Sequence, residues 1–341
     1  MAKEEQNLTV ACVGAGYFAR FHYDAWNRIE QARIVASVDK NLENARATGL
    51  NAYTDLDEMF EKETPDILDI IIPPAGHLDC IRTALFNGVK AIICQKPFCK
   101  DIEEALEAVA LAKAADVPII VHENFRFQPW YRIMNEAIKT NVLGDVHQIT
   151  FRLRTGDGQG PDAYLDRQPY FQEMPKFLIH ETGVHWIDTF RYLLGEPVGV
   201  YADLRKMNPV ISGEDAGYFI MDFADGKRAL FDANRHLDHS AENCRTTLGE
   251  CLLEGTKGVI SLSGNGELKM RSFASLEQET LLKPEAWQGF AGDCVHALQS
   301  HVVSAMLGNG VFENEAKDYI RNIELEAAIY ESAQRKSRVS V

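Results

Sequence analysis

The sequence predicts two domains: an α/β Rossmann domain with a doubly wound parallel sheet, and an α+β domain with an open, mainly antiparallel sheet. Short β-branched runs alternate with helical stretches over residues 8–122, which is typical of βαβ units. After Pro129 the pattern changes to one helix followed by several runs with strand periodicity. The 341 residues, 46% of them apolar, are enough chain for two hydrophobic cores.

We place the first domain at residues 1–125. Its predicted strands are short and rich in Val and Ile, and helical periodicity fills the segments between them. The predicted strands are Leu8–Val13, Arg33–Asp39, Ile67–Ile72, Lys90–Cys94 and Ile119–His122, and the predicted helices are Tyr17–Ile29, Asp55–Glu61, His77–Asn87 and Ile102–Ala115.

We place the second domain at residues 126–341. The stretch 155–176 has little periodicity, and a loop of that length is often a lid or a binding loop. The two closing helices can pack back on the first domain. Around the loop we predict helices at 129–141, 181–194, 287–307 and 315–333, and strands at 146–154, 198–206, 217–223, 228–234, 247–254 and 258–262.

Net charge and composition limit the classes of binding partner. Lys plus Arg number 35 and Asp plus Glu number 50, a net charge of −15, which disfavours binding to nucleic acid or to an anionic membrane. No apolar run could span a bilayer, and Met1–Gln6 lack the apolar core of a signal peptide. We therefore expect a cytoplasmic protein. The seven cysteines form no CxxC pair, so we expect reduced thiols and no metal site.

A dinucleotide fingerprint follows the first strand. Gly14 permits a tight turn, Gly16 lets the backbone approach a pyrophosphate, and Ala19 keeps the helix close to the strand. Tyr17 and Phe18 begin the predicted helix, whose exposed N–H groups would bind the phosphates. The alternative is that this pattern merely closes a turn.

The end of the second strand indicates which dinucleotide binds. Asp39 lies where an acidic residue accepts hydrogen bonds from a ribose 2′-hydroxyl, and its charge would repel a 2′-phosphate. The neighbouring Lys40 would soften that repulsion. We therefore expect NAD rather than NADP, with a strand-end turn as the alternative role of Asp39.

Lys96 follows the fourth predicted strand, at the sheet edge where open α/β sheets hold ligands. Pro97 restricts its backbone and can form a cis bond, so a rigid turn would aim the lysine side chain. Without further motifs, a solvated lysine at the start of a loop is the simpler interpretation.

The glycine fingerprint, Pro73 with His77, Lys96-Pro97 and a later Gly-Val-His at His185 occur in an order that resembles the Gfo/Idh/MocA family of NAD(P)-dependent oxidoreductases. The resemblance implies that Lys96 and His185 are catalytic and that Pro73 and His77 border the cofactor. Glu181 occupies the family's aspartate position.

Two positions depart from the family pattern. Gln95 replaces the usual glutamate, which removes an anion beside Lys96 and would make the neutral amine easier to reach. Glu181 adds a methylene to the usual aspartate. On an α-helix Glu181, His185 and Asp188 share a face, although a solvated face of an amphipathic helix would give the same pattern.

Further candidate site residues lie where the chain passes from the first domain to the second, and within the second domain. We expect Asn124 to contact nicotinamide or substrate, and Arg126 to contact substrate or to form an ion pair at the domain interface. Arg154 and the loop residue Asp162 are candidates for recognising substrate hydroxyls, with sheet solubility and a plain surface loop as the alternatives. These segments also show a weaker resemblance to D-apiose dehydrogenases of the family.

The resemblance implies an NAD-dependent oxidation of a CH–OH group in a sugar or polyol, for example an aldose such as D-apiose. One alternative is an NADP-linked reductase of a keto-sugar or dione. Another is a catalytically silent NAD(H)-binding regulator. The resemblance also implies a homo-oligomer, a dimer or tetramer formed through the open sheet face.

Overall fold

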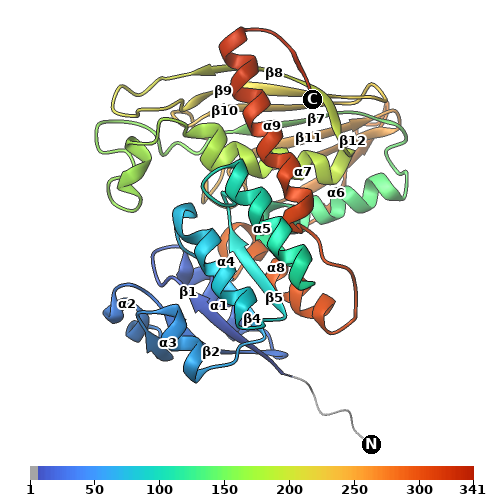
Figure 1. Cartoon of the computed structure of the whole chain (residues 1–341). Coiled ribbons are helices and arrows are strands. Elements are labelled where there is room, and N and C mark those ends of the chain that lie inside the picture. Colours follow the sequence, from blue (N-terminus) through green and yellow to red (C-terminus); the bar gives the residue numbers. More distant parts are fainter. Residues whose placement is uncertain (1–6) are drawn as a thin grey trace, which may run out of the picture. The chain divides into compact units, whose positions relative to one another are not determined.

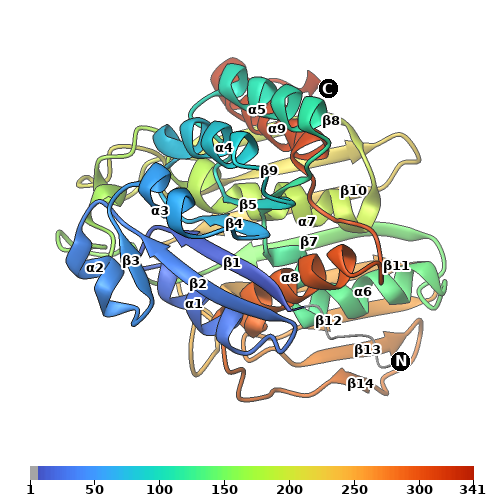
Figure 2. The same ribbon diagram turned by 60° about the horizontal axis from the view of Figure 1, so that its bottom comes forward.

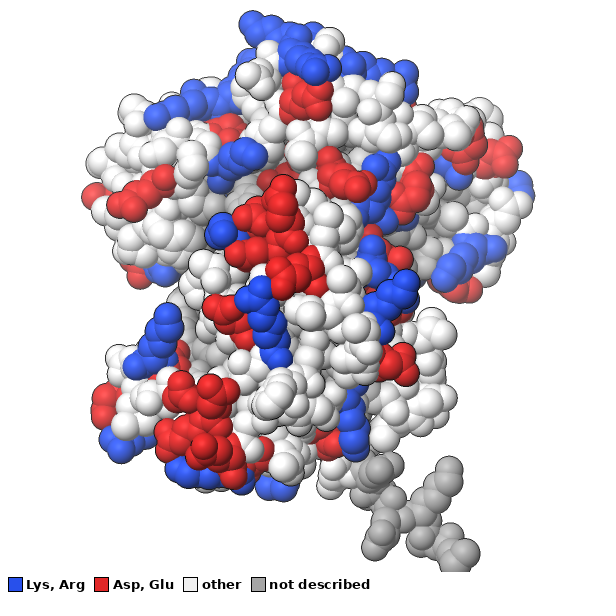
Figure 3. Space-filling model, viewed as in Figure 1, with Lys and Arg blue, Asp and Glu red and all other residues white. Residues whose placement is uncertain are grey.

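The computed structural model describes residues 7–341, and Figures 1 and 2 show its ribbon from two directions. The segment Met1–Gln6, in which we expect no signal peptide, lies outside the described residues. Between residues 7 and 341, no helix combines the length and apolar character needed to cross a bilayer. On the face shown in Figure 3, acidic side chains gather in several groups with basic ones between them, in keeping with the acidic composition.

The chain folds into two compact units. The first unit contains the chain through Asn124 together with Val295–Ile323. The second contains Phe125–Cys294 together with Glu324–Val341. The C-terminal part of the chain therefore contributes to both units, through helices α8 (Phe290–Met306) and α9 (Ala316–Arg335).

The first unit contains the predicted doubly wound sheet, with six parallel strands in the order β3-β2-β1-β4-β5-β6. All five predicted strands are present. The sequence did not predict β3 or α2, because so few residues carry no measurable periodicity. The elements are β1 (Leu8–Val13), α1 (Ala19–Asn27), β2 (Ala32–Val38), α2 (Leu42–Ala47), β3 (Asn51–Tyr53), α3 (Leu56–Lys62), β4 (Ile67–Ile70), η1 (Pro74–Gly76), α4 (His77–Phe86), β5 (Ala91–Gln95), α5 (Ile102–Ala115) and β6 (Ile119–His122).

The two faces of this sheet differ in chemistry. Alternate strand residues such as Leu68 and Ile92 pack against α4 and α5 in an apolar core. The residues between them point to the other face, where Asp69 in the middle of β4 meets His22 and Trp26 of α1. A charged residue in a central strand is unusual and shapes the site described below.

The second unit contains an open sheet of nine strands in the order β14-β13-β12-β11-β7-β10-β9-β8-β15. Every pairing is antiparallel except that of β10 with β7, so the sheet is mainly antiparallel as predicted. Strands β13 to β15 were not predicted, because all three are short and charged residues interrupt the apolar pattern of β13 and β14. The strands are β7 (Val146–Leu153), β8 (Pro197–Arg205), β9 (Ala216–Phe223), β10 (Arg228–Asn234), β11 (Gly249–Gly255), β12 (Gly258–Leu262), β13 (Leu268–Ser272), β14 (Glu279–Leu282) and β15 (Val339–Ser340).

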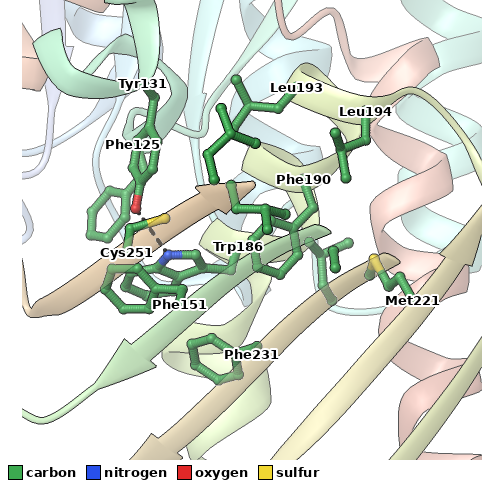
Figure 4. Packing of buried hydrophobic residues seen from close by; sticks show 14 of the residues in the cluster. Phe125, Tyr131, Phe151, Trp186, Phe190, Leu193, Leu194, Met221, Phe231 and Cys251 are labelled. Atoms are coloured by element: carbon green, nitrogen blue, oxygen red, sulfur yellow. Dashed lines mark hydrogen bonds between the residues drawn. The ribbon is translucent and has the colours of Figure 1, made fainter. Parts of the chain in front are cut away.

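Helices α6 (Pro129–Lys139) and α7 (Val184–Leu194), with the second half of α9, bury their apolar residues against one face of this sheet. Figure 4 shows Trp186 of α7 at the centre of this core, with ring centroids 4.2 Å from Phe151 and 5.1 Å from Phe231. Its indole N–H donates to the Tyr131 hydroxyl at 3.1 Å, so the one polar atom of the ring is satisfied. This packing fixes α7 on the sheet.

The stretch without periodicity between residues 155 and 176 is ordered. It contains one short helix, η3 (Pro169–Gln172), and folds around Tyr164, Phe171 and Phe177, which form a small apolar cluster with Ile211. This cluster is separate from the main core of the second unit, so the loop has a core of its own.

Candidate functional site

The glycine turn after β1 has the geometry that the fingerprint requires. Gly14 has φ +106°, and a Cβ there would lie 2.4 Å from the Ile71 carbonyl oxygen, so only glycine fits. A Cβ on Gly16 would meet no atom within 4 Å, which leaves its backbone open to a ligand. Helix α1 begins at Ala19, so Tyr17 and Phe18 lie in the turn and not in the helix as predicted.

Asp39 holds this turn through its carboxylate. Oδ2 accepts the Ala15 N–H at 2.8 Å and Oδ1 accepts the Asn41 N–H at 2.9 Å. Each oxygen keeps a second lone pair for a ribose hydroxyl. The neighbouring Lys40 is exposed. Beside the turn opens a cavity of about 320 Å³, lined by Ala15, Gly16, Arg20, Tyr23, Asn27, Asn44, Ala47, Thr48 and Leu50.

His77 joins the end of β4 to the turn that follows β5. Its Nε2–H donates to the Ile72 carbonyl oxygen at 2.8 Å, and its Nδ1 accepts the Cys99 N–H at 3.3 Å. Burial lowers the pKa of this imidazole to about 4, so the ring is neutral at pH 7. The ring thus holds two loop backbones together, and its contact with a cofactor stays a prediction. Pro73, in extended backbone just before η1, is exposed.

Lys96 is half-buried directly after β5, and its bond to Pro97 is cis. The preceding Gln95 is buried, and its side chain is used inside the unit. Its Oε1 accepts the Lys96 backbone N–H at 3.2 Å, while Nε2 lies 2.8 Å from His22 Nε2 and 3.2 Å from His122 Nδ1. The residue type alone indicates only that a charge is missing beside the lysine amine, because these contacts depend on which side chains pack around Gln95.

Asn124, the last residue of the first unit's main segment, is 2% exposed. Its Nδ2 has no hydrogen-bond partner among residues 7–341. A buried amide donor without a partner costs free energy unless a ligand supplies an acceptor. Together with the open side of Gly16 and the remaining lone pairs of Asp39, this donor fits a dinucleotide.

In the second unit, Glu181 lies in a π-helical turn, η4 (Leu178–Gly183), and the α-helix begins only at Val184. The predicted α-helix from residue 181 is therefore wrong at its start. Glu214 Oε1 explains the wider turn, because it accepts the N–H groups of Phe177 and Ile179 at 3.2 and 3.1 Å. π-turns are frequent at functional sites.

His185 and Asp188 are not on a solvated helix face. His185 is 8% exposed, and its ring stacks on Phe125 with centroids 3.8 Å apart and planes 8° from parallel. Asp188 is 1% exposed and accepts both arms of Arg126, at 2.8 and 2.6 Å. Arg126 therefore forms a bidentate ion pair within the second unit, and its contact with substrate stays a prediction.

A buried cluster around Arg235 was not predicted. Arg235 is 4% exposed just after β10, and its guanidinium lies 4.5 Å from the Phe177 ring centroid. It donates to the Thr182 hydroxyl in η4 and, at 3.4 Å, to the Asp157 carboxylate in the loop. Arg167 pairs with the same carboxylate at 2.5 Å. No local pattern joins residues so far apart in the chain.

This cluster also sets the charge of its members. Burial would raise the pKa of Asp157, but the Arg235 and Arg167 charges and the Thr155 hydroxyl outweigh burial and lower it. Asp157 thus stays ionised and ties the loop to the turn that carries Glu181. Burial, and then the Glu181 charge, raise the pKa of Tyr170 in the same loop to about 12, so this tyrosine stays protonated.

Two further predicted substrate residues are Arg154 and Asp162. Arg154 is 8% exposed and pairs with Asp232 on β10 at 2.6 Å. Asp162 is exposed in the loop. Both stay predictions as substrate contacts.

Two family models match the chain. The oxidoreductase family model with an NAD-binding Rossmann fold, of the Gfo/Idh/MocA type, matches residues 8–123. The model of the GFO/IDH/MocA C-terminal domain matches residues 131–261. The matches therefore cover the glycine turn, Asp39, Lys96, Glu181 and His185.

Individual relatives extend over almost the whole chain. The D-apiose dehydrogenase of Paraburkholderia graminis is 28% identical over 97% of this chain and 89% of its own length. That of Rhizobium rhizogenes is 28% identical over 98% of this chain and 97% of its own. An oxidoreductase from Agrobacterium radiobacter, solved with NAD+, L-tartaric acid and magnesium, is 26% identical with a TM-score of 0.88 and covers 98% of both chains.

Proposed function

The chain belongs to the Gfo/Idh/MocA family of oxidoreductases, and from this premise we propose that it is an NAD-dependent dehydrogenase acting on a CH–OH group of a sugar or polyol. The observation that carries the proposal is the glycine turn, with Gly16 open to a ligand and Asp39 at the end of β2. The two D-apiose dehydrogenases support an aldose such as D-apiose as substrate.

The cofactor-binding residues follow from the first unit. The backbone N–H groups of the turn from Gly16 to Phe18 would hold the pyrophosphate, because those of Gly14 and Ala15 already donate to Val38 and Asp39. Asp39 would accept the ribose hydroxyls, and Asn124 would donate to the nicotinamide amide or to the substrate. We also assign Lys40, Pro73 and His77 to the border of this site. When bound, NAD takes up the hydride from the substrate carbon.

The proton of the reacting hydroxyl needs an acceptor. We assign this role to the His185 imidazole, because histidine titrates near neutral pH with little tuning. Lys96 would donate a hydrogen bond to the same oxygen and stabilise the negative charge that develops there. Glu181 would orient the substrate or the imidazole.

A panel of aldoses, including D-apiose, with polyols and hydroxy acids tests the proposal. Each would be offered with NAD and with NADP while the absorbance of the reduced nicotinamide is followed. We expect turnover of at least one sugar or polyol with NAD. Tight NAD binding without any turnover would instead favour the regulator, and activity confined to NADPH with a keto-sugar would favour the reductase.

We also propose a homo-oligomer. A largely apolar row crosses the sheet face that points away from the main core; in register it consists of Tyr201, Ile220, Leu230, Thr150 and Leu252. Leu252 is 44% exposed, and an exposed apolar row of this kind favours association. Light scattering should give a dimer or tetramer, and Leu230→Asp should shift it toward monomer. A monomeric wild-type protein would contradict the proposal. The cytoplasmic location stays a prediction.

A further inference from the structure

The first unit buries a polar chain on the α1 face of its sheet. Asp69, fully buried in β4, uses one carboxylate oxygen, Oδ2, for several donors. His22 Nδ1 and Trp26 Nε1 each lie 2.8 Å from it, and Gln299 Nε2 lies at 3.3 Å. His22 continues through its other nitrogen to Gln95. We call Asp69, His22, Gln95 and His122 the amide–imidazole chain.

The hydrogen bonds fix which atoms carry protons. The Lys96 backbone N–H can only donate, so the Gln95 atom it meets at 3.2 Å must be the oxygen. The amide NH₂ then faces His22 Nε2 at 2.8 Å and His122 Nδ1 at 3.2 Å. An NH₂ group has no lone pair to offer, so both ring nitrogens must be acceptors. Gln299 Nε2 also lies 3.3 Å from His22 Nδ1, but the Asp69 carboxylate oxygen at 2.8 Å can only accept, so Nδ1 carries a proton and the Gln299 amide donates to Asp69. His22 is therefore neutral with its proton on Nδ1, and His122 is neutral with its proton on Nε2.

Two further observations agree with neutral rings. The His22 and His122 ring centroids are 4.1 Å apart, where two buried cations would repel each other strongly. The donors from α1 and α8 to the Asp69 carboxylate, the Trp26 indole and the Gln299 amide, are uncharged. The Asp69 charge also acts on the thiols of Cys12 and Cys94 and on the Tyr23 hydroxyl; burial is the largest cause that raises the pKa of each, and Asp69 raises it further.

We propose that Gln95 is a positioning residue for Lys96, and that this position requires glutamine because its amide both accepts from the Lys96 N–H and donates to the two rings of the amide–imidazole chain. The chain anchors the Gln95 amide so that its oxygen holds the Lys96 backbone N–H at one end of the turn. At the other end, His77 Nδ1 holds the Cys99 N–H. The Lys96 backbone thus lies between two side-chain acceptors that are themselves fixed from inside the unit.

A glutamate at this position would change the protonation of the interior. The oxygen in place of Nε2 would face the lone pairs of both His22 Nε2 and His122 Nδ1. His122 could donate to this oxygen by moving its proton from Nε2 to Nδ1, whereas His22, whose Nδ1–H faces Asp69, could donate only by taking up a proton. His22 would then be an imidazolium between two carboxylates. The inference that this turn positions a catalytic lysine rests on the proposed function, whereas the protonation states do not.

The first experiment is ¹⁵N NMR of the histidine rings in the wild-type protein and in Gln95→Glu. We expect wild-type His22 protonated on Nδ1 only and His122 on Nε2 only. In Gln95→Glu, His22 should become an imidazolium at neutral pH. A wild-type His22 that is cationic at pH 7 or protonated on Nε2 would overturn the proposal, as would a neutral His22 in Gln95→Glu.

The second experiment tests positioning with Gln95→Met, which removes the amide but keeps the side-chain length. Exchange of the Lys96 backbone amide hydrogen should become at least tenfold faster. With a substrate in hand, kcat should fall about 10- to 100-fold, since small misplacements of a reacting group cost that much. The NAD dissociation constant should stay within about twofold.

Ile81→Ala in α4 is the matched control, because Ile81 is fully buried in the apolar core on the opposite sheet face. It should lower the melting temperature while keeping kcat and the Lys96 amide exchange. If Gln95→Met and Ile81→Ala behave alike in kcat and exchange, Gln95 is merely structural. A chain inactive on every substrate would contradict the proposed function, whereas the ring tautomers and amide exchange would still decide this inference.

Discussion

Two buried polar clusters, one in each unit, are stabilised in opposite ways. In the first, one carboxylate, Asp69, is surrounded by neutral donors from Trp26, His22 and Gln299. In the second, buried charges meet opposite charges, as in Arg235 with Asp157. Neutral hydrogen bonds fix orientation and proton location, whereas ion pairs tie segments together but leave a costly charge when one partner is lost. The neutral arrangement is suited to orienting the turn at Lys96, and the charged arrangement is suited to anchoring the loop that contains Asp157.

The largest expected effect tests whether each unit supplies one reacting group. Lys96→Met in the first unit and His185→Ala in the second should each lower kcat by about 10²- to 10⁴-fold, the usual worth of a proton-transfer group. NAD binding, measured by titration, should be nearly unchanged in both. The double variant should lose less than the product of the single losses. Near wild-type kcat in both single variants would remove these residues from the mechanism.

The second largest expected effect is on the free energy of unfolding, and it distinguishes the charged cluster of the second unit from the neutral one of the first. Arg235→Met removes the buried guanidinium and leaves the half-buried Asp157 with one cation fewer, which should cost about 3–5 kcal/mol in the free energy of unfolding. Trp26→Phe removes one neutral donor from Asp69 and should cost about 1–3 kcal/mol. Urea denaturation measures both.

Arg152→Met, which breaks an exposed pair with Glu250, is the control and should change the free energy of unfolding little. If Arg235→Met costs no more than Trp26→Phe, the distinction between charged and neutral interiors does not hold for stability.

The third expected effect is that the two units contribute to stability over different pH ranges. The pKa of His77 is about 4 in the folded protein and near 6.5 when unfolded, so the unfolded chain binds the extra proton between these values. Stability is therefore complete above pH 6.5 and falls toward pH 4, by about 3 kcal/mol. The pKa of Asp157 is lowered, so its contribution is present above pH 3.8 and is lost only below it.

His77→Gln keeps a donor for Ile72 and an acceptor for Cys99 but cannot titrate. Denaturation at pH 7 and pH 4.5 should show a smaller loss of stability in this variant than in the wild type. Asp157→Asn should leave the loss between these two pH values unchanged. An unchanged loss in His77→Gln would mean that another group titrates in this range.

The smallest effect concerns cofactor choice in the first unit. Asp39→Ser should narrow the preference for NAD over NADP by roughly tenfold or more, because a charged acceptor for the ribose is lost and repulsion of a 2′-phosphate disappears. Direct titration with both cofactors measures the change. Tighter binding of NADP by the wild type would mean that Asp39 was misassigned and that Lys40 contacts the ribose.

Gly16→Val should abolish the binding of both cofactors while the fold survives.

Local chemistry made much of the first unit predictable. The glycine turn, Asp39 and the five longer strands of the parallel sheet carry their signals within a few neighbouring residues, and the structure has them close to the predicted positions. The mainly antiparallel sheet of the second unit was also predictable from alternation, except for its shortest strands. Where the signal was only a periodicity, as at Glu181, the prediction missed the π-turn.

The sequence by itself thus determined the fold class, the cofactor turn and the positions of Lys96 and His185 in the chain. Only the tertiary structure decided what surrounds them. Gln95 meets His22, 73 residues away, and Arg235 meets Asp157, 78 residues away. Such contacts depend on which strands become neighbours and on which face each side chain points to, and no local pattern encodes either. The partners that fix protons and charges near the candidate site are therefore set by packing.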